Sequence, residues 1–381
     1  MRVALVGGNG HGRWHRRRLA AAHASGTIAF VGVAEPRPLD PDPPLPAGVP
    51  VFPDHGSLLA ATRPDILVIC TPPATHLPIA LDAVAAGCDL LLEKPPVLTL
   101  AEHARLAATL SAAGRACQVG FQALGSPALD RLRAAVASGD LGTVTGVAAV
   151  AAWQRDDAYY ARAPWAGRRA VDGALVNPLG HAVMECLALA GGGAVARLEV
   201  ERYRTRPIEV DDTAVLRLTL HDGPPVVVAV TLAGEEFVAG EVTVSGTRGR
   251  ATLEYPTDRL RLPGDPAPRE VPGRVDLLVN LAAHRADPAG VPLRAPLAAT
   301  AGFTAVVEAI GRAPLPVALG EDVVADIGTG PARVRSIRGV NEVLRRAAGD
   351  LALPSELGVP WARLPYTEND LQTTGTPARQ K

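Results

Sequence analysis

Lys94 is the residue of this chain whose type and position most directly suggest chemistry. The 38 basic residues include only two lysines, Lys94 and Lys381, and all the others are arginines. Either side chain supplies charge at a solvated surface, but a guanidinium stays protonated, whereas a compact ammonium can sit beside a reacting atom. The lysine kept in the segment LLLEKPPVL is therefore a candidate for catalysis, with chance retention as the alternative.

A glycine-rich segment near the N-terminus has the composition of a phosphate-binding loop. In VALVGGNGHGRWH, a frame of the form G-x-G-x-x-G runs from Gly7 to Gly12, with Asn9 at its middle glycine. Bare backbone lets a pyrophosphate approach, and a helix N-terminus supplies N–H donors and a favourable dipole. We expect cofactor contacts from Gly7, Asn9, Gly10, His11 and Gly12; a glycine-rich turn without a ligand is the alternative.

Two charged residues follow the second expected strand and bear on the choice of cofactor. Glu35 ends that strand, where a carboxylate can accept hydrogen bonds from a ribose diol, and this favours NAD. Arg37 lies two residues further on and could meet a 2′-phosphate instead. We therefore predict NAD, with NADP as the alternative.

The elements that must position these residues alternate between strand and helix over the first 122 residues. Apolar runs at 3–7, 28–35, 65–72 and 88–95 each end near a candidate residue, and helical patterns separate them. Strands that alternate with helices imply a parallel sheet covered on both faces. We expect an α/β Rossmann domain over residues 1–122.

The pattern changes after residue 122. Several strands follow with the hairpin signals HDG and GTRG, and helices return near 301–312 and 329–348. We expect residues 123–348 to form an α+β domain for substrate binding and oligomerisation, built on a large, mostly antiparallel sheet. Residues 349–381 are expected to be a C-terminal extension, mobile from residue 366 because the sequence there has little apolar content.

Composition excludes several classes of protein. A net charge of −1 argues against binding to nucleic acid or to a membrane surface. The four cysteines have no metal-ligand spacing, so we expect reduced thiols, no metal site and a cytoplasmic protein. The chain opens directly into an expected strand, so no signal peptide is predicted, and no apolar run is long enough to span a membrane.

The glycine loop, the segment CTPPATH and the tripeptide EKP together resemble the Gfo/Idh/MocA oxidoreductase family. The resemblance implies a Rossmann domain followed by an α+β domain. It implies that Glu93 and Lys94 of EKP lie at the cofactor, with the lysine reaching both nicotinamide and substrate. It also implies that the nucleotide is lined by Thr71, Pro72 and His76, and that Gln122 of VGFQ lies near the nicotinamide.

A second mark of this resemblance is the segment GALVNPLGHAVME. The family often has an acid four positions before a histidine here; this chain has Asn177 and His181. The resemblance implies that both residues bind substrate and act in catalysis, with His181 as the base; the alternative for His181 is a buried structural histidine. Asn177 followed by Pro178 also suits a helix N-cap, and the two roles can coexist. A place in the first helical turn would disfavour the imidazolium and keep His181 a neutral base.

The segment APWAGRRAVDGA borders the substrate in the family, so Tyr160, Trp165 and Arg168 are candidates for the substrate wall, with structural roles as the alternative. We expect an NAD(P)-dependent oxidoreductase that acts on a secondary alcohol of a sugar, polyol or cyclitol. The alternatives are a glycosidase of the same fold that uses bound NAD transiently and a non-catalytic nucleotide-binding or regulatory protein. The apolar segment VVVAVTLAG suggests a sheet with two apolar faces, and hence a homo-oligomer.

Overall fold

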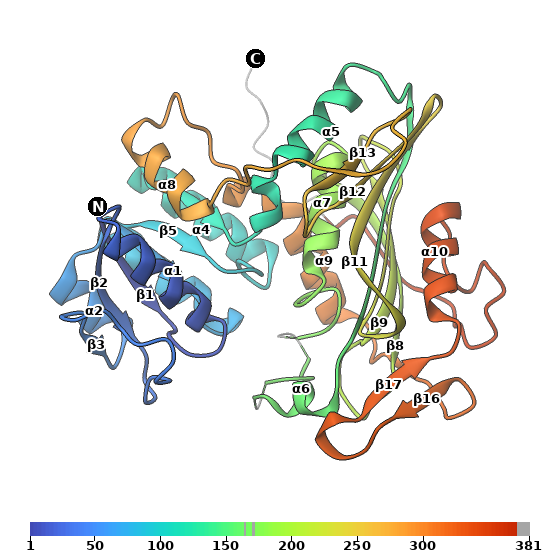
Figure 1. The fold of residues 1–381 in the computed structure, drawn as a ribbon, viewed down its shortest axis with the longest axis horizontal. Helices are drawn as coiled ribbons and strands as arrows, with labels where there is room; N and C mark the ends of the chain where they lie inside the picture. The colour runs from blue at the N-terminus through green and yellow to red at the C-terminus, as the bar shows by residue number, and fades with distance from the viewer. Residues whose placement is uncertain (164, 170–171, 372–381) are drawn as a thin grey trace. The chain divides into compact units, whose positions relative to one another are not determined.

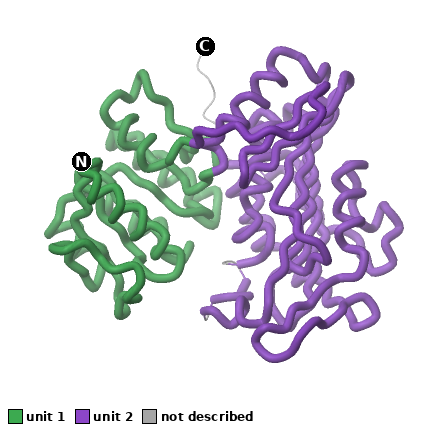
Figure 2. Tube along the Cα trace, viewed as in Figure 1, with its two compact units in different colours: residues 1–122, 275–300 green, residues 123–274, 301–381 purple. Residues whose placement is uncertain are grey.

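The chain divides into two units, which Figure 2 colours green and purple. The computed structural model describes residues 1–163, 165–169 and 172–371. Unit 1 combines residues 1–122 with residues 275–300, and unit 2 combines residues 123–274 with the chain from residue 301 onward.

Unit 1 is built on a parallel sheet whose strand order is β3-β2-β1-β4-β5-β6. Its strands are β1 Arg2–Val6, β2 Ala29–Ala34, β3 Val51–Phe52, β4 Ile66–Ile69, β5 Asp89–Leu92 and β6 Cys117–Val119. Its helices are α1 Gly12–Ala24, α2 His55–Thr62, η1 Pro73–Thr75, α3 His76–Ala85, α4 Leu100–Ala113, α8 Leu277–Ala286 and η3 Leu297–Thr300. The order reverses between β1 and β4, and ligands of such sheets bind at the carboxyl ends of strands beside that point. The predicted Rossmann fold is confirmed.

The segment 275–300 belongs to unit 1, although we expected it within a domain spanning 123–348. The side chain of Gln118, fully buried in β6, donates to Asn280 Oδ1 at 2.7 Å and accepts from the Ala295 N–H at 2.8 Å. The N–H of Val119 donates to the Ala295 carbonyl at 2.8 Å. The returning chain thus provides hydrogen-bond partners for groups along the edge of β6. Without it, that edge strand would expose unpaired backbone groups.

Unit 2 is built on a ten-stranded mixed sheet with the order β14-β13-β12-β11-β7-β10-β9-β8-β15, in which β18 also pairs with β8. Among the strand pairs of the described residues, only β10–β7 and β15–β8 in this sheet are parallel, so the predicted mostly antiparallel sheet is confirmed. The strands are β7 Val144–Gln154, β8 Val195–Arg204, β9 Thr213–Leu220, β10 Val226–Thr231, β11 Ala233–Gly246, β12 Gly249–Glu254, β13 Arg259–Arg261, β14 Arg269–Glu270, β15 Val317–Ala318 and β18 Tyr366–Asn369. A separate pair is β16 Val324–Ile327 with β17 Val334–Ile337.

Helices lie on both sides of this sheet. The helices of this part of the chain are η2 Gln122–Gly125, α5 Pro127–Ala137, α6 Asp157–Ala161, α7 Gly180–Leu189, α9 Ala301–Arg312, η4 Gly330–Ala332 and α10 Val340–Asp350. Figure 1 shows α7 and α10 on opposite sides of the strands. Val227 and Ala229 of β10 pack with Val340 and Leu344 of α10 in one buried cluster. This chain's own α10 covers one apolar face of β10, so that face needs no second copy of the chain to bury it. The oligomeric state stays a prediction.

Two further expectations about the C-terminal part are wrong. Residues 366–369 are not a mobile tail but form β18, which pairs antiparallel with β8; residues 372–381 lie outside the described residues. The expected helix at 329–348 begins only at Val340, after Gly339 with φ +72°, and its first part instead contains η4 and β17. In the described part of the chain, no helix combines the length and apolar character that a membrane span requires.

Candidate active site

The loop between β1 and α1 has the backbone shape that a pyrophosphate site needs. A Cβ atom on Gly12 would lie 1.9 Å from the carbonyl oxygen of Gly7, so only glycine lets the loop close over the start of α1. Gly10 has φ +58° and open space where its Cβ would be. The loop therefore fits a phosphate group that approaches bare backbone at a helix N-terminus.

Asn9, which stands at the middle glycine of the frame, fastens this loop to the proline-rich segment that follows β2. Its Oδ1 accepts from the Asp40 N–H at 2.8 Å, and its Nδ2 donates to the Pro38 carbonyl at 3.0 Å. The side chain thus makes two specific bonds that glycine could not make. The departure from the G-x-G-x-x-G frame therefore has a structural role in this chain.

The Glu35 carboxylate contacts the backbone of the glycine loop between β1 and α1. Its side chain is 4% exposed, and its Oε2 accepts from the N–H groups of Gly8 and Asn9, both at 3.2 Å. Its Oε1 accepts from Arg37 Nε, also at 3.2 Å. Arg37 is 72% exposed and paired with Glu35, and its contact with a cofactor phosphate stays a prediction.

The loop after β4 is held by a buried histidine. His76 is 1% exposed, and its ring nitrogens lie 2.9 Å from the carbonyl oxygens of Thr71 and Pro95. Burial lowers the pKa of His76, although both carbonyls oppose that shift. His76 therefore connects the Thr71 loop to the segment after β5, while Thr71 is partly exposed and Pro72 exposed. Contact of these three residues with a cofactor stays a prediction.

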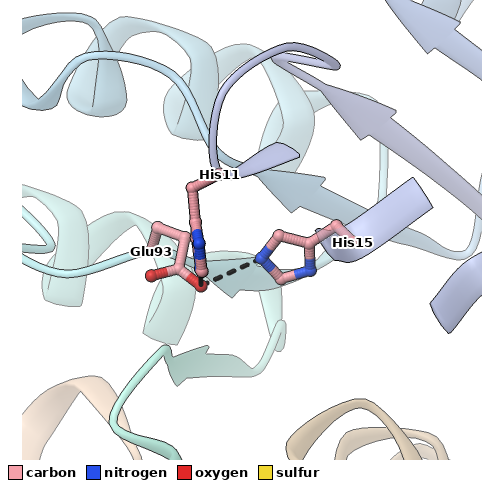
Figure 3. Close-up of side chains that lie close together, drawn as sticks. All are labelled: His11, His15 and Glu93. Atoms are coloured by element: carbon pink, nitrogen blue, oxygen red, sulfur yellow. Dashed lines mark hydrogen bonds and ion pairs between the residues drawn. The ribbon is translucent and has the colours of Figure 1, made fainter. Parts of the chain in front are cut away.

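Glu93 follows β5 and faces His11, the N-cap residue of α1, and His15 in the first turn of that helix, as Figure 3 shows. Glu93 Oε1 lies 2.9 Å from His15 Nε2 and 3.6 Å from His11 Nε2. Burial alone would raise the pKa of Glu93, but its interactions with His11 and His15 outweigh burial and hold that pKa well below its usual value. We did not single out His15 from the sequence, although two histidines four residues apart at a helix start were a visible signal.

Lys94 is partly buried, and its backbone N–H donates to Glu93 Oε2 at 3.3 Å. The anchored carboxylate therefore helps to fix the backbone from which the lysine side chain extends. Gln122, the third residue after β6, begins η2 and is partly buried. Both residues follow the carboxyl ends of their strands, as expected for this part of a Rossmann sheet.

In unit 2, His181 is the second residue of α7 and is partly buried. The helix begins at Gly180 with Leu179 as its N-cap, and no side chain caps it. The predicted N-cap role of Asn177 is therefore wrong: the residue lies in the turns before α7, and its N–H donates to the Gly173 carbonyl at 3.0 Å.

Asp172 organises this turn, although no sequence pattern pointed to it. The carboxylate is buried and accepts from Asn177 Nδ2 at 3.0 Å, from Arg162 Nη2 at 3.1 Å and from the Gly167 N–H at 2.9 Å. An acid is thus hydrogen-bonded to Asn177, at the position where the family pattern has an acid of its own. No spacing rule predicts this pair, because it depends on an irregular turn.

The three expected wall residues differ in their surroundings. The ring of Tyr160 lies under the Arg206 guanidinium at 4.9 Å, and its buried hydroxyl has no hydrogen-bond partner among the described residues. Trp165 is 36% exposed with Arg162 over its ring at 4.7 Å. Arg168 pairs with Glu209 at 2.5 Å on the surface. Substrate contact stays a prediction for all three; residues 164, 170 and 171 of this segment lie outside the described residues.

Glu185 lies one turn after His181 on α7 and is 1% exposed. Its Oε2 has no hydrogen-bond partner within the described residues. Burial raises the pKa of Glu185 to about 8, while the charges of Arg133 and Arg274 oppose the rise. The carboxyl group is therefore mostly protonated at neutral pH.

Comparison with known proteins gives two matches to family models. Residues 1–121 match a model described as "Oxidoreductase family, NAD-binding Rossmann fold". Residues 129–252 match a "GFO/IDH/MocA C-terminal domain". The two matches fall on either side of the boundary at residue 122.

Curated relatives match parts of the chain. D-glucoside 3-dehydrogenase of Escherichia coli (strain K12) is 30% identical over 94 residues, which is 25% of this chain and 27% of that protein. Inositol 2-dehydrogenase of Acidothermus cellulolyticus is 29% identical over 143 residues, which is 37% of this chain and 42% of that protein. Each match spans less than half of the relative's length.

A solved structure covers more of the chain. The WlbA dehydrogenase from Bordetella pertussis, in complex with NADH and UDP-GlcNAcA, has a TM-score of 0.70 and 22% sequence identity. The alignment covers 84% of this chain and 99% of that one. At this identity the likeness shows the fold.

Proposed function

Because the chain belongs to the Gfo/Idh/MocA oxidoreductase family, we propose that it oxidises a secondary alcohol of a sugar, polyol or cyclitol with NAD. The observation that carries the proposal is the set of groups after the parallel strands of unit 1: the glycine loop after β1, Glu35 after β2 and Lys94 after β5. The relatives named D-glucoside 3-dehydrogenase and inositol 2-dehydrogenase support the substrate class.

Within this proposal, the backbone of residues 7–12 holds the pyrophosphate and Glu35 selects NAD over NADP. A carboxylate at this point favours a free ribose diol and repels a 2′-phosphate. The Arg37 guanidinium, already paired with Glu35 at 3.2 Å, adds little that would attract the extra phosphate. When bound, NAD supplies the acceptor for the hydride that leaves the alcohol carbon.

The proposed catalytic pair is His181 and Lys94. The His181 imidazole takes the hydroxyl proton as general base, and the Lys94 ammonium donates to the same oxygen as its negative charge develops. Asn177 binds the substrate beside them, and its amide is oriented by Asp172 at 3.0 Å. A guanidinium in place of Lys94 would be wider and planar, so charge alone does not reproduce the ammonium.

The test combines cofactor titration with a panel of sugars, polyols and cyclitols, followed by the absorbance of NADH. Release of NADH from free NAD with at least one polyol or sugar is the expected result. His181→Ala should lose it, whereas His55→Ala, which removes a histidine paired with Asp82 at 2.8 Å on unit 1, should keep it. Glycoside cleavage without net NADH would support the glycosidase instead, and NAD binding without turnover on any substrate would support a non-catalytic protein.

A further inference from the structure

Three side chains with metal-binding atoms meet at the start of α1. His11 and His15 are four residues apart, so they project from one face of the helix start, and Glu93 approaches from the end of β5. Figure 3 shows the carboxylate facing both rings. The three donor atoms all lie within 4.8 Å of one another.

Two of the three donor separations are close to those of a tetrahedral zinc site, and the third, between the two histidines, lies within 4.8 Å. Zinc bonds of about 2.0–2.1 Å to nitrogen and oxygen place neighbouring ligand atoms about 3.3 Å apart. Glu93 Oε1 is 3.6 Å from His11 Nε2 and 2.9 Å from His15 Nε2. These two separations would change by only a few tenths of an ångström, which side-chain rotation can supply.

The surroundings hold two of the donors in place and leave one side open. The side chains of His15 and Glu93 are 5% and 8% exposed, whereas that of His11 is 57% exposed. The ring of Trp14 stacks on that of His11 with centroids 5.7 Å apart and meets the His15 ring edge-on. A metal here would have three protein ligands and a fourth position open to water, as in zinc sites with exchangeable ligands.

We propose that His11, His15 and Glu93 form a binding site for Zn²⁺. Two imidazoles and one carboxylate suit Zn²⁺ and its late first-row neighbours, whereas Mg²⁺ and Ca²⁺ prefer sets made of oxygen ligands. The four cysteines contribute none of these donors, which is why their spacing gave no sign of the site. A metal would join the phosphate loop to the end of β5.

The test is a titration of the full-length chain, free of any histidine tag and treated with chelator, first with Co²⁺ and then with Zn²⁺. Co²⁺ should give visible absorption bands of tetrahedral coordination at one equivalent, and Zn²⁺ should displace it. His11→Ala should weaken Zn²⁺ binding by at least about a hundredfold, because losing even an outer-shell partner of a metal ligand costs about 10–100-fold. This variant should fold, since the side chain is largely exposed.

A second variant and a control separate the site from adventitious binding. His15→Gln should also weaken binding by at least about a hundredfold, and circular dichroism will show whether it is folded. His55→Ala removes a histidine–carboxylate pair that has no third ligand in the described structure, and it should bind Zn²⁺ like the wild type. Failure of the wild type to bind, equal binding by His11→Ala, or equal loss in His55→Ala would overturn the site. His11 and Glu93 are also among the residues expected at the cofactor, so metal binding is measured without NAD or substrate, and failure of the metal site is then distinguished from failure of the proposed dehydrogenase activity.

Discussion

The buried carboxyl of Glu185 should make the stability of unit 2 fall as pH rises. Its pKa is raised from 4.5 to about 8 because burial disfavours the charged form. A carboxyl whose pKa is higher in the folded state stabilises the fold fully below its unfolded pKa. That contribution is lost progressively as pH rises from about 4.5 to about 8.

The magnitude follows from the size of the shift. Each pKa unit corresponds to about 1.4 kcal/mol, so the full effect is about 5 kcal/mol, of which roughly 3 kcal/mol falls between pH 5 and pH 8. Glu185→Gln keeps the shape of the side chain and removes its titration. Relative to the wild type, this variant should therefore gain about 3 kcal/mol between these two pH values.

The assay is thermal and urea unfolding of both proteins from pH 5 to pH 8.5. For a domain of this size the relative gain corresponds to roughly 6–12 °C in Tm. Glu342→Gln, which removes an exposed carboxylate from α10 of the same unit, is the matched control and should run parallel to the wild type. Parallel curves for Glu185→Gln and the wild type would refute the reasoning, because they would mean that Glu185 titrates alike in the folded and unfolded chains.

Three further predictions concern the proposed site. Lys94→Arg and Lys94→Ala should each lose roughly a hundredfold or more in kcat, as on removal of one preorganised donor; a Lys94→Arg enzyme with near-normal turnover would show that charge alone suffices. His181→Ala should lose a similar factor in kcat. In steady-state kinetics, the double variant Lys94→Ala/His181→Ala should lose less kcat than the product of the two single losses, because both groups act on one oxygen. Losses that multiply would argue against that shared action. Calorimetry should show tighter binding of NAD than of NADP. Glu35→Ala should weaken NAD binding by about 1–2 kcal/mol, whereas Arg37→Ala should change NAD binding little. A preference for NADP would contradict the role given to Glu35.

The sequence predicted unit 1 well where local pattern and tertiary structure agree. Apolar strands that alternate with helices have few ways to fold other than a parallel sheet, and this places the residues after each strand on one edge. Glu35 was singled out for that reason, whereas Lys94 was singled out by its residue type and Thr71 by the family resemblance. The segment 275–300 escaped prediction because its place depends on Gln118 and Asn280, which are far apart in the chain and pair only in the folded unit.

Unit 2 was harder to predict because its important contacts arise from irregular backbone. Asn177 and Pro178 have the residue types of a helix start, yet α7 begins later, at Gly180. The residues before it form turns in which the Asn177 side chain bonds to Asp172. Likewise, β18 consists of polar residues whose strand conformation comes from pairing with β8 rather than from any apolar pattern of its own. Tertiary pairing overrode local preference in both places.

The replacement of the family's acid by Asn177 changes what His181 can do with a proton. An amide does not titrate, so Asn177 can orient a substrate hydroxyl but cannot accept the proton that the base removes. The acid on this turn, Asp172, accepts hydrogen bonds from Asn177, Arg162 and the Gly167 N–H, so three of its roughly four lone-pair sites hold the turn together. In the proposed reaction, therefore, proton removal depends on His181 alone, while the charge on the substrate oxygen depends on Lys94. This division of labour gives a chemical reason for keeping one lysine in a chain whose other described basic side chains are arginine or histidine.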